Sequence, residues 1–183
     1  MDLLTLDTNI IRDWAWSEGA PSETRYGNDP DKRLSLSVQF KCLKALRDAG
    51  RCKLAVTNQV FTDYESGGGA LPRHIKDIID SYLPYALPSI STFPIIFPTV
   101  FVDKAEIDAI FATVFPHSKP EHKRYASNRK DALQLYAHKV ANRDFFLTSD
   151  KDILLAGTAL QRSWGIHVIT LDEYLASAES KPV

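Results

Sequence analysis

The stretch Met1-Asp2-Leu3-Leu4-Thr5-Leu6-Asp7-Thr8-Asn9 decides the fold class. Its apolar residues run directly into an acid and then into polar residues that commonly start helices. This order predicts a short buried strand whose carboxyl end delivers the Asp7 carboxylate to a strand-to-helix turn. Open parallel sheets keep their active sites at that end of their strands. Asp7 is therefore the first candidate for a functional site, and other residues should join it there.

Three further apolar runs of strand length follow, at residues 53–56, 145–148 and 167–170. Segments with helical spacing of apolar residues separate them, and the predicted helices are 8–16, 34–49, 57–66, 72–82, 102–115, 128–142, 150–160 and 171–177. Ser127 or Asn128 is the expected cap of the helix that ends near Asn142. Short apolar strands that alternate with helices indicate a parallel sheet covered on both faces. The predicted fold is α/β, a three-layer α/β/α sandwich with a central parallel sheet of four to five strands.

The 183 residues are predicted to form a single domain, residues 1–183, with two additions. One is a loop insertion at about 17–32, rich in Gly and Pro, and the other is a proline-rich connector at about 83–102. The connector is apolar, but prolines at that density break a helix, so no membrane span is expected.

Charge and cysteine content restrict the function further. The formal net charge is -1, so no global basic field draws the chain to nucleic acid and any such contact must be local. Cys42 and Cys52 have neither metal-ligand nor disulfide-framework spacing, which predicts reduced thiols. Without a recognisable signal peptide, the expected location is cytoplasmic.

Acidic residues are expected at one edge of the sheet: Asp7, Asp63 or Glu65, Asp131 and Asp150. Taken singly, each has a structural explanation, since Asp7 and Asp150 can cap helices and Asp131 can sit in a first helical turn. Taken together they would repel, by about 4 kcal/mol for two charges about 4 Å apart at an effective dielectric near 20, unless a cation neutralises them. Oxygen ligands without paired His or Cys favour Mg²⁺ or Mn²⁺ over zinc. Such a cluster suits metal-assisted phosphodiester hydrolysis.

The same residues resemble a known family. Leu6-Asp7-Thr8-Asn9, an acid in the helix after the second strand, Asp131 in a long helix and Thr148-Ser149-Asp150-Lys151-Asp152 look like the PIN domain, the fold of VapC-type toxin ribonucleases. The resemblance spans nearly the whole chain and lies in the order and spacing of four acids. It implies a metal-dependent endoribonuclease that leaves 5′-phosphates, with Asp7, Asp131 and Asp150 as metal ligands and Asn9 and Ser149 supporting them by hydrogen bonds.

The second acid is open between two residues. Counting six residues on from Thr57 favours Asp63, whereas Glu65 offers the side chain that the family usually has. Residues two apart on a helix point nearly opposite ways, so only one of them can face the site. Asp152 is interpreted either as an outer ligand of the metal or as a first-turn helix charge.

Residues 117–130 are polar and basic, with five Lys or Arg residues against one acid, and immediately precede Asp131. Lys123, Arg124 and Lys130 are therefore candidates for holding an RNA backbone, against the alternative of a solvated loop. His138 lies seven residues after Asp131 on the same helical face, and it is either a general base or a packed or surface histidine.

The sequence as a whole favours a ribonuclease that uses Mg²⁺ or Mn²⁺ bound by Asp7, Asp63, Asp131 and Asp150. RNA is then the substrate, with an antitoxin protein or a second copy of the chain as protein partners. The alternative is a catalytically weak PIN-like module that binds RNA or protein. A receiver domain also gathers acids at strand ends, but it needs a Lys after a late strand, and Lys151 directly follows Asp150.

Overall fold

The structure is a computed structural model that describes residues 1–20, 29–57, 60, 72–82 and 103–180. Its sheet comprises β1 (Asp2–Leu6), β2 (Cys52–Val56), β3 (Phe145–Leu147) and β4 (Val168–Ile169). All the pairings are parallel, and the strand order is β2-β1-β3-β4. Leu6, the last residue of β1, pairs with both Val56 and Leu147, so three strands end level with one another.

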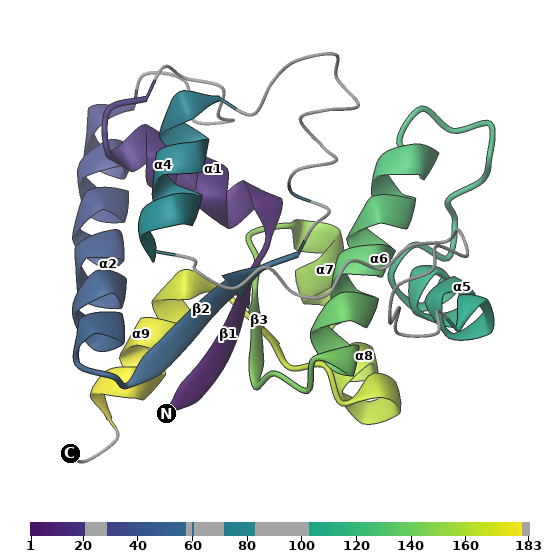
Figure 1. Cartoon of the computed structure of the whole chain (residues 1–183). Helices are drawn as coiled ribbons and strands as arrows, with labels where there is room; N and C mark the ends of the chain where they lie inside the picture. The colour runs from purple at the N-terminus through teal and green to yellow at the C-terminus, as the bar shows by residue number, and fades with distance from the viewer. Residues whose placement is uncertain (21–28, 58–59, 61–71, 83–102, 181–183) are drawn as a thin grey trace, which may run out of the picture.

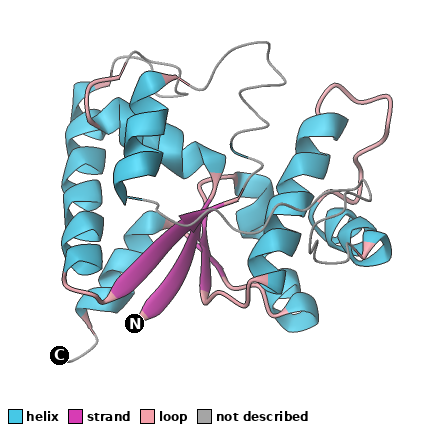
Figure 2. Ribbon diagram, in the orientation of Figure 1, coloured by secondary structure: helices cyan, strands magenta, loops and turns pink. Residues whose placement is uncertain are grey.

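Helices cover both faces of this sheet (Figure 1). One layer contains α1 (Thr8–Ser17), α2 (Pro30–Asp48), α4 (Arg73–Tyr82) and α9 (Leu171–Glu179). The opposite layer contains α5 (Lys104–Val114), α6 (Tyr125–Val140), α7 (Lys151–Leu155) and α8 (Gly157–Trp164). Figure 2 shows the strands between the two groups of helices. The predicted α/β/α sandwich is therefore confirmed, with four parallel strands among the described residues.

Two apolar cores hold the layers to the sheet. Trp14 of α1 is fully buried and stacks on Phe40 of α2, with ring centroids 5.0 Å apart. On the other face, Phe146 of β3 packs with Ile110 of α5 and Leu135 of α6. Fully burying a side chain of this kind contributes about 1.5–3 kcal/mol, so both faces anchor the strand ends that carry the site.

Several predicted helix boundaries are wrong. Helix α2 begins at Pro30 rather than Leu34, because the Asp29 side chain accepts a 2.9 Å hydrogen bond from the Lys32 N–H and Pro30 fits the first turn. Helix α6 begins at Tyr125, so neither Ser127 nor Asn128 caps it. The helix predicted for 150–160 is divided at Ala156 into α7 and α8.

The strand order places a topological switch point between β1 and β3. From β1 the chain crosses to β2 on one side of the sheet, and β3 then lies on the other side of β1. Open parallel sheets bind ligands in the crevice beyond the carboxyl ends of such strands. Asp7 directly follows β1, and Thr148 to Asp150 follow β3. Within the described ranges, none of the helices combines the length and apolar character needed to cross a membrane.

Candidate active site

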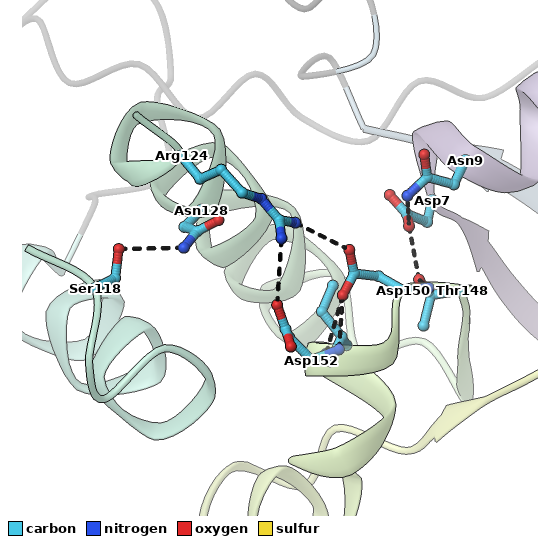
Figure 3. A network of polar contacts seen from close by, with 9 residues as sticks. Asp7, Asn9, Ser118, Arg124, Asn128, Thr148, Asp150 and Asp152 are labelled. Atoms are coloured by element: carbon cyan, nitrogen blue, oxygen red, sulfur yellow. Dashed lines mark hydrogen bonds and ion pairs between the residues drawn. The ribbon is translucent and has the colours of Figure 1, made fainter. Parts of the chain in front are cut away.

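Asp7 occupies the N-cap position of α1 but does not cap it. Its side chain makes no capping hydrogen bond, and only 2% of the residue is exposed. Instead, Oδ2 accepts a 2.7 Å hydrogen bond from the Thr148 hydroxyl and a 3.4 Å bond from the Asn9 amide (Figure 3). The capping explanation for Asp7 is therefore wrong. Both bonds stabilise the charged carboxylate and hold it at the junction of β1 and β3.

Asp150 combines capping with a position in the site. Its Oδ1 accepts hydrogen bonds from the N–H groups of Asp152, at 2.8 Å, and Ile153, at 3.4 Å, so it caps α7 as predicted. The other oxygen, Oδ2, lies 3.9 Å from the Arg124 guanidinium. Capping thus uses one oxygen of Asp150 and leaves the second directed toward the basic segment.

Asp131 lies deeper in its helix than predicted. Because α6 begins at Tyr125, Asp131 is in the second turn, and the first turn carries no acid. The favourable interaction of an acid with the helix dipole is largely confined to the first turn. The helix-start explanation for Asp131 therefore loses its physical basis.

One cavity of about 480 Å³ brings these residues together. We call it the central cavity, and it is lined by Asp7, Thr8, Asn9, Arg12, Arg124, Ala126, Ser127, Lys130, Asp131 and Asp150. Three of the four predicted acids share it with two of the three predicted RNA-binding cations, Arg124 and Lys130. Acids and cations thus line the same cavity, beyond the switch point of the sheet.

The remaining predicted site residues are either outside the described residues or at other described positions. Asp63 and Glu65 are outside the described residues. Asp152 is exposed in the first turn of α7, 3.8 Å from the Arg124 guanidinium. Asp152 and Lys123 line a neighbouring cavity. Ser149 is not among the residues that line the central cavity.

Two further residues, Thr148 and Arg12, belong to the site and are not predicted from the sequence. Thr148, not Ser149, donates the hydroxyl bond to Asp7, and it also accepts a 3.0 Å bond from the Asp150 N–H. Thr148 therefore joins both acids. Arg12 lines the central cavity beside Thr8. Arg12 could have been predicted, because it is four residues after Thr8 and residues four apart on a helix lie on one face.

His138 is packed in the interior and does not line the central cavity. Only 1% of it is exposed, its Nδ1 lies 2.9 Å from the Thr5 hydroxyl, and its ring meets Phe146 edge-on. Burial, together with the nearby positive charge of Arg143, lowers the pKa of His138 to about 3. The general-base interpretation is therefore wrong, and His138 is a neutral core residue that joins α6 to β1.

His138 should make stability depend on pH. The pKa of an unfolded histidine is about 6.5, so as the pH falls from 6.5 toward 3 the unfolded chain binds a proton that the folded chain excludes. The free energy of unfolding should thus be highest above pH 6.5 and fall below it, by up to about 1.4 kcal/mol per pH unit. Urea denaturation at pH 7 and pH 5 measures this loss.

The matched variants are His138→Asn, which retains a polar nitrogen near the position of Nδ1, and His117→Gln at an exposed position. We expect His138→Asn to reduce the loss of stability between pH 7 and pH 5, and His117→Gln to leave it unchanged. If both variants lost as much unfolding free energy between pH 7 and pH 5 as the parent protein, another group would cause the pH dependence.

No protein-family model and no curated protein matches this chain. Among the described residues, no three His, Cys, Asp or Glu side chains are grouped closely enough to hold one ion together. The possible metal ligands that line the central cavity are nevertheless oxygen donors: the carboxylates of Asp7, Asp131 and Asp150, the Asn9 amide and the hydroxyls of Thr8 and Ser127. Hard oxygen donors without His or Cys favour Mg²⁺ or Mn²⁺ over zinc.

Proposed function

We propose that this protein is a metal-dependent endoribonuclease of the PIN type. The observation that carries the proposal is the convergence of Asp7, Asp131 and Asp150 on one cavity beyond the switch point of a parallel sheet. Their separate structural explanations do not account for this convergence. Asp7 does not cap its helix, Asp131 lies beyond the first turn, and Asp150 caps with only one oxygen.

In this proposal the three carboxylates would hold Mg²⁺ or Mn²⁺, with Asp63 or Glu65 as the fourth acid. When bound, the metal would supply an activated water and would stabilise charge on the leaving oxygen. Asp7 is already oriented for this role, because Thr148 and Asn9 fix one of its oxygens. Hydrolysis adds water across the bond between phosphorus and the 3′-oxygen, and leaves a 5′-phosphate and a 3′-hydroxyl.

The cations of the central cavity would position the RNA backbone. Arg12, Arg124 and Lys130 line the cavity together with the acids. The Arg124 side chain is 66% exposed, and its ion pairs with Asp150 and Asp152 are long, at 3.9 and 3.8 Å. Exposed ion pairs contribute little to stability, so a phosphate can replace these partners at small cost. With a net charge of -1, binding to RNA would rest on this local group.

The direct test mixes purified protein with single-stranded RNA in Mn²⁺ or Mg²⁺. We expect cleavage that stops in EDTA and yields 5′-phosphorylated ends, and we expect Asp131→Asn to lower the rate by about 10²-fold or more. Asp80→Asn, on the exposed surface of α4, is the matched control and should cleave normally. Cleavage that persists in EDTA, or in Asp131→Asn, would contradict the proposal.

Removal of cations from the central cavity should weaken RNA binding without changing its dependence on base identity. The logarithm of the RNA-binding constant falls linearly with the logarithm of the salt concentration. For single strands, each lost phosphate contact makes this slope less steep by about 0.7. Arg124→Ala and Lys130→Ala should both show this change, measured by fluorescence anisotropy of labelled RNA in EDTA at several salt concentrations. Lys41→Ala, exposed on α2, should keep the slope of the parent. Equal slopes in all three variants would show that RNA does not cross this cavity.

One observation favours the alternative, a PIN-like binding module. The Arg124 guanidinium lies beside Asp150 and provides some of the positive charge that a metal would supply. A calorimetric titration with Mn²⁺ separates the two functions. Heat of binding that is lost in Asp131→Asn supports the nuclease, and its absence in the parent protein supports the binding module. In a VapC-like toxin, an antitoxin protein would be a further partner.

A further inference from the structure

A second cavity of about 480 Å³ adjoins the central cavity and shares Arg124 with it. We call it the side pocket, and it is formed by residues 114–118 and 122–124 together with Asn128 and Asp152. Figure 3 shows Arg124 between the Asn128–Ser118 pair and Asp150 of the central cavity. A ligand that neutralises Arg124 can therefore extend from one cavity into the other.

The chemistry of the side pocket changes from its floor to its rim. Val114 and Phe115 are buried apolar side chains that also belong to the core beneath α5. His117 and His122 are exposed at the rim, as is Lys123. An apolar floor with aromatic rings and a cation at the opening suits a flat aromatic group that is attached to phosphate.

The loop that forms the rim is held in place by its own hydrogen bonds. The Ser118 N–H donates to the Phe115 carbonyl at 3.0 Å, and the Lys119 N–H donates to Nδ1 of His122 at 3.2 Å. The second bond orients the His122 ring and leaves its Nε2 to carry the proton of the neutral form. A rim ordered in advance lowers the entropy that a ligand must overcome on binding.

Asn128 provides a polar group within this apolar pocket. It is only 7% exposed, and its amide nitrogen donates a 3.2 Å hydrogen bond to the Ser118 hydroxyl. Its carbonyl oxygen has no hydrogen-bond partner in the part of the chain that the structure describes. A buried acceptor without a partner is unfavourable, and a ligand with an N–H group would satisfy it. Every nucleobase carries such a donor on its edge.

We propose that the side pocket binds one unpaired base of the RNA whose backbone crosses the central cavity. The inference rests on the proposed nuclease function and adds to it a base-binding subsite, in which one base is turned out beside the scissile phosphate. A base within a duplex is paired and stacked and cannot enter. Arg124 would hold the phosphate that connects the two cavities.

The test measures binding in EDTA, where cleavage does not interfere. Full-length protein is titrated with a fluorescent single-stranded pentanucleotide and with an abasic chain of the same length and charge. We expect the abasic chain to bind about tenfold more weakly, because it keeps the phosphates and loses the stacked base. Equal affinities for the two chains would overturn the side pocket as a base site.

Substitutions in the side pocket test whether the tighter binding of the base-containing chain arises there. Asn128→Ala and the double variant His117→Ala/His122→Ala should bind the abasic chain as the parent does, but should lose the tenfold preference for bases. The two histidines are exposed, so the double variant should fold even if Asn128→Ala does not. Lys41→Ala should keep the preference. A preference that persists in the double variant would place base binding elsewhere and overturn the inference.

The outcomes separate this inference from the proposed function. A base preference without cleavage in Mn²⁺ would support the pocket and contradict the nuclease. Cleavage without a base preference would support the nuclease and contradict the pocket. No binding of either chain would contradict both.

Discussion

Asp7→Asn should lower the rate of RNA cleavage by about 10³-fold, equivalent to about 4 kcal/mol of transition-state stabilisation. The amide has the shape of the carboxylate, and its oxygen can still accept the bond from Thr148. The substitution therefore removes charge from the central cavity without removing the contact that joins β1 to β3. Single-turnover cleavage of a defined RNA at saturating protein measures the loss.

Stability measurements distinguish this loss from unfolding. Asp7 shares its cavity with two other carboxylates, so removal of its charge should not lower the free energy of unfolding in EDTA. In the parent protein, Mn²⁺ at about 100 times its Kd should add about 2.7 kcal/mol, and Asp7→Asn should lose most of this gain. Asp80→Asn should retain both activity and the Mn²⁺ effect. Normal cleavage by Asp7→Asn would remove this acid from the mechanism.

A pair of substitutions at Asp150 should separate its two roles. Asn is as good an N-cap as Asp, so Asp150→Asn should keep the cap of α7 and the stability of the parent. Its cleavage rate should nevertheless fall by about 10²-fold or more, because the charge directed into the cavity is lost. Asp150→Ala should lose both the activity and about 1 kcal/mol of unfolding free energy. Urea denaturation and cleavage assays on the two variants give the comparison.

Asp29→Ala provides the matched control for capping. Asp29 caps α2 through the Lys32 N–H, at 2.9 Å, and does not line the central cavity. We expect it to lose about 1 kcal/mol of stability and to cleave RNA at the parent rate. If Asp150→Asn also cleaved at the parent rate, Asp150 would be a helix cap alone.

The sheet was predictable because its signal is local. Four short apolar runs, each followed by helix-starting residues, predicted the strands in order and their parallel arrangement. Helix starts were less predictable. Helix α6 begins after Arg124, whose side chain makes no capping bond, so no residue in the sequence marks that end. Asp29 and Pro30 mark the start of α2, but the Gly and Pro content of residues 17–32 predicts a loop there.

The site was predictable only in part. Asp7 and Asp150 could be named because they follow strand ends, whereas Asp131 was named from a predicted helix start that lies six residues earlier, at Tyr125. A helix cap and a metal ligand have the same local sequence. Contacts between residues far apart in the chain distinguish the two roles, in particular the hydrogen bond that Thr148 donates to Asp7 across 141 positions. His138 likewise has the spacing of a site residue on α6, and only its burial against Thr5 and Phe146 identifies it as core.

The sequence by itself determined the α/β class, the parallel strands and the identity of three acids that could share a site. Apolar runs and helix-starting residues encode these features over a few neighbouring positions. Only the tertiary structure placed β3 beside β1, which brings Asp7 and Asp150 to one switch point and sets Asp131 beside them. The same packing placed Arg124 between two cavities. Such proximity arises from the pairing of strands far apart in the chain, and no local pattern records it.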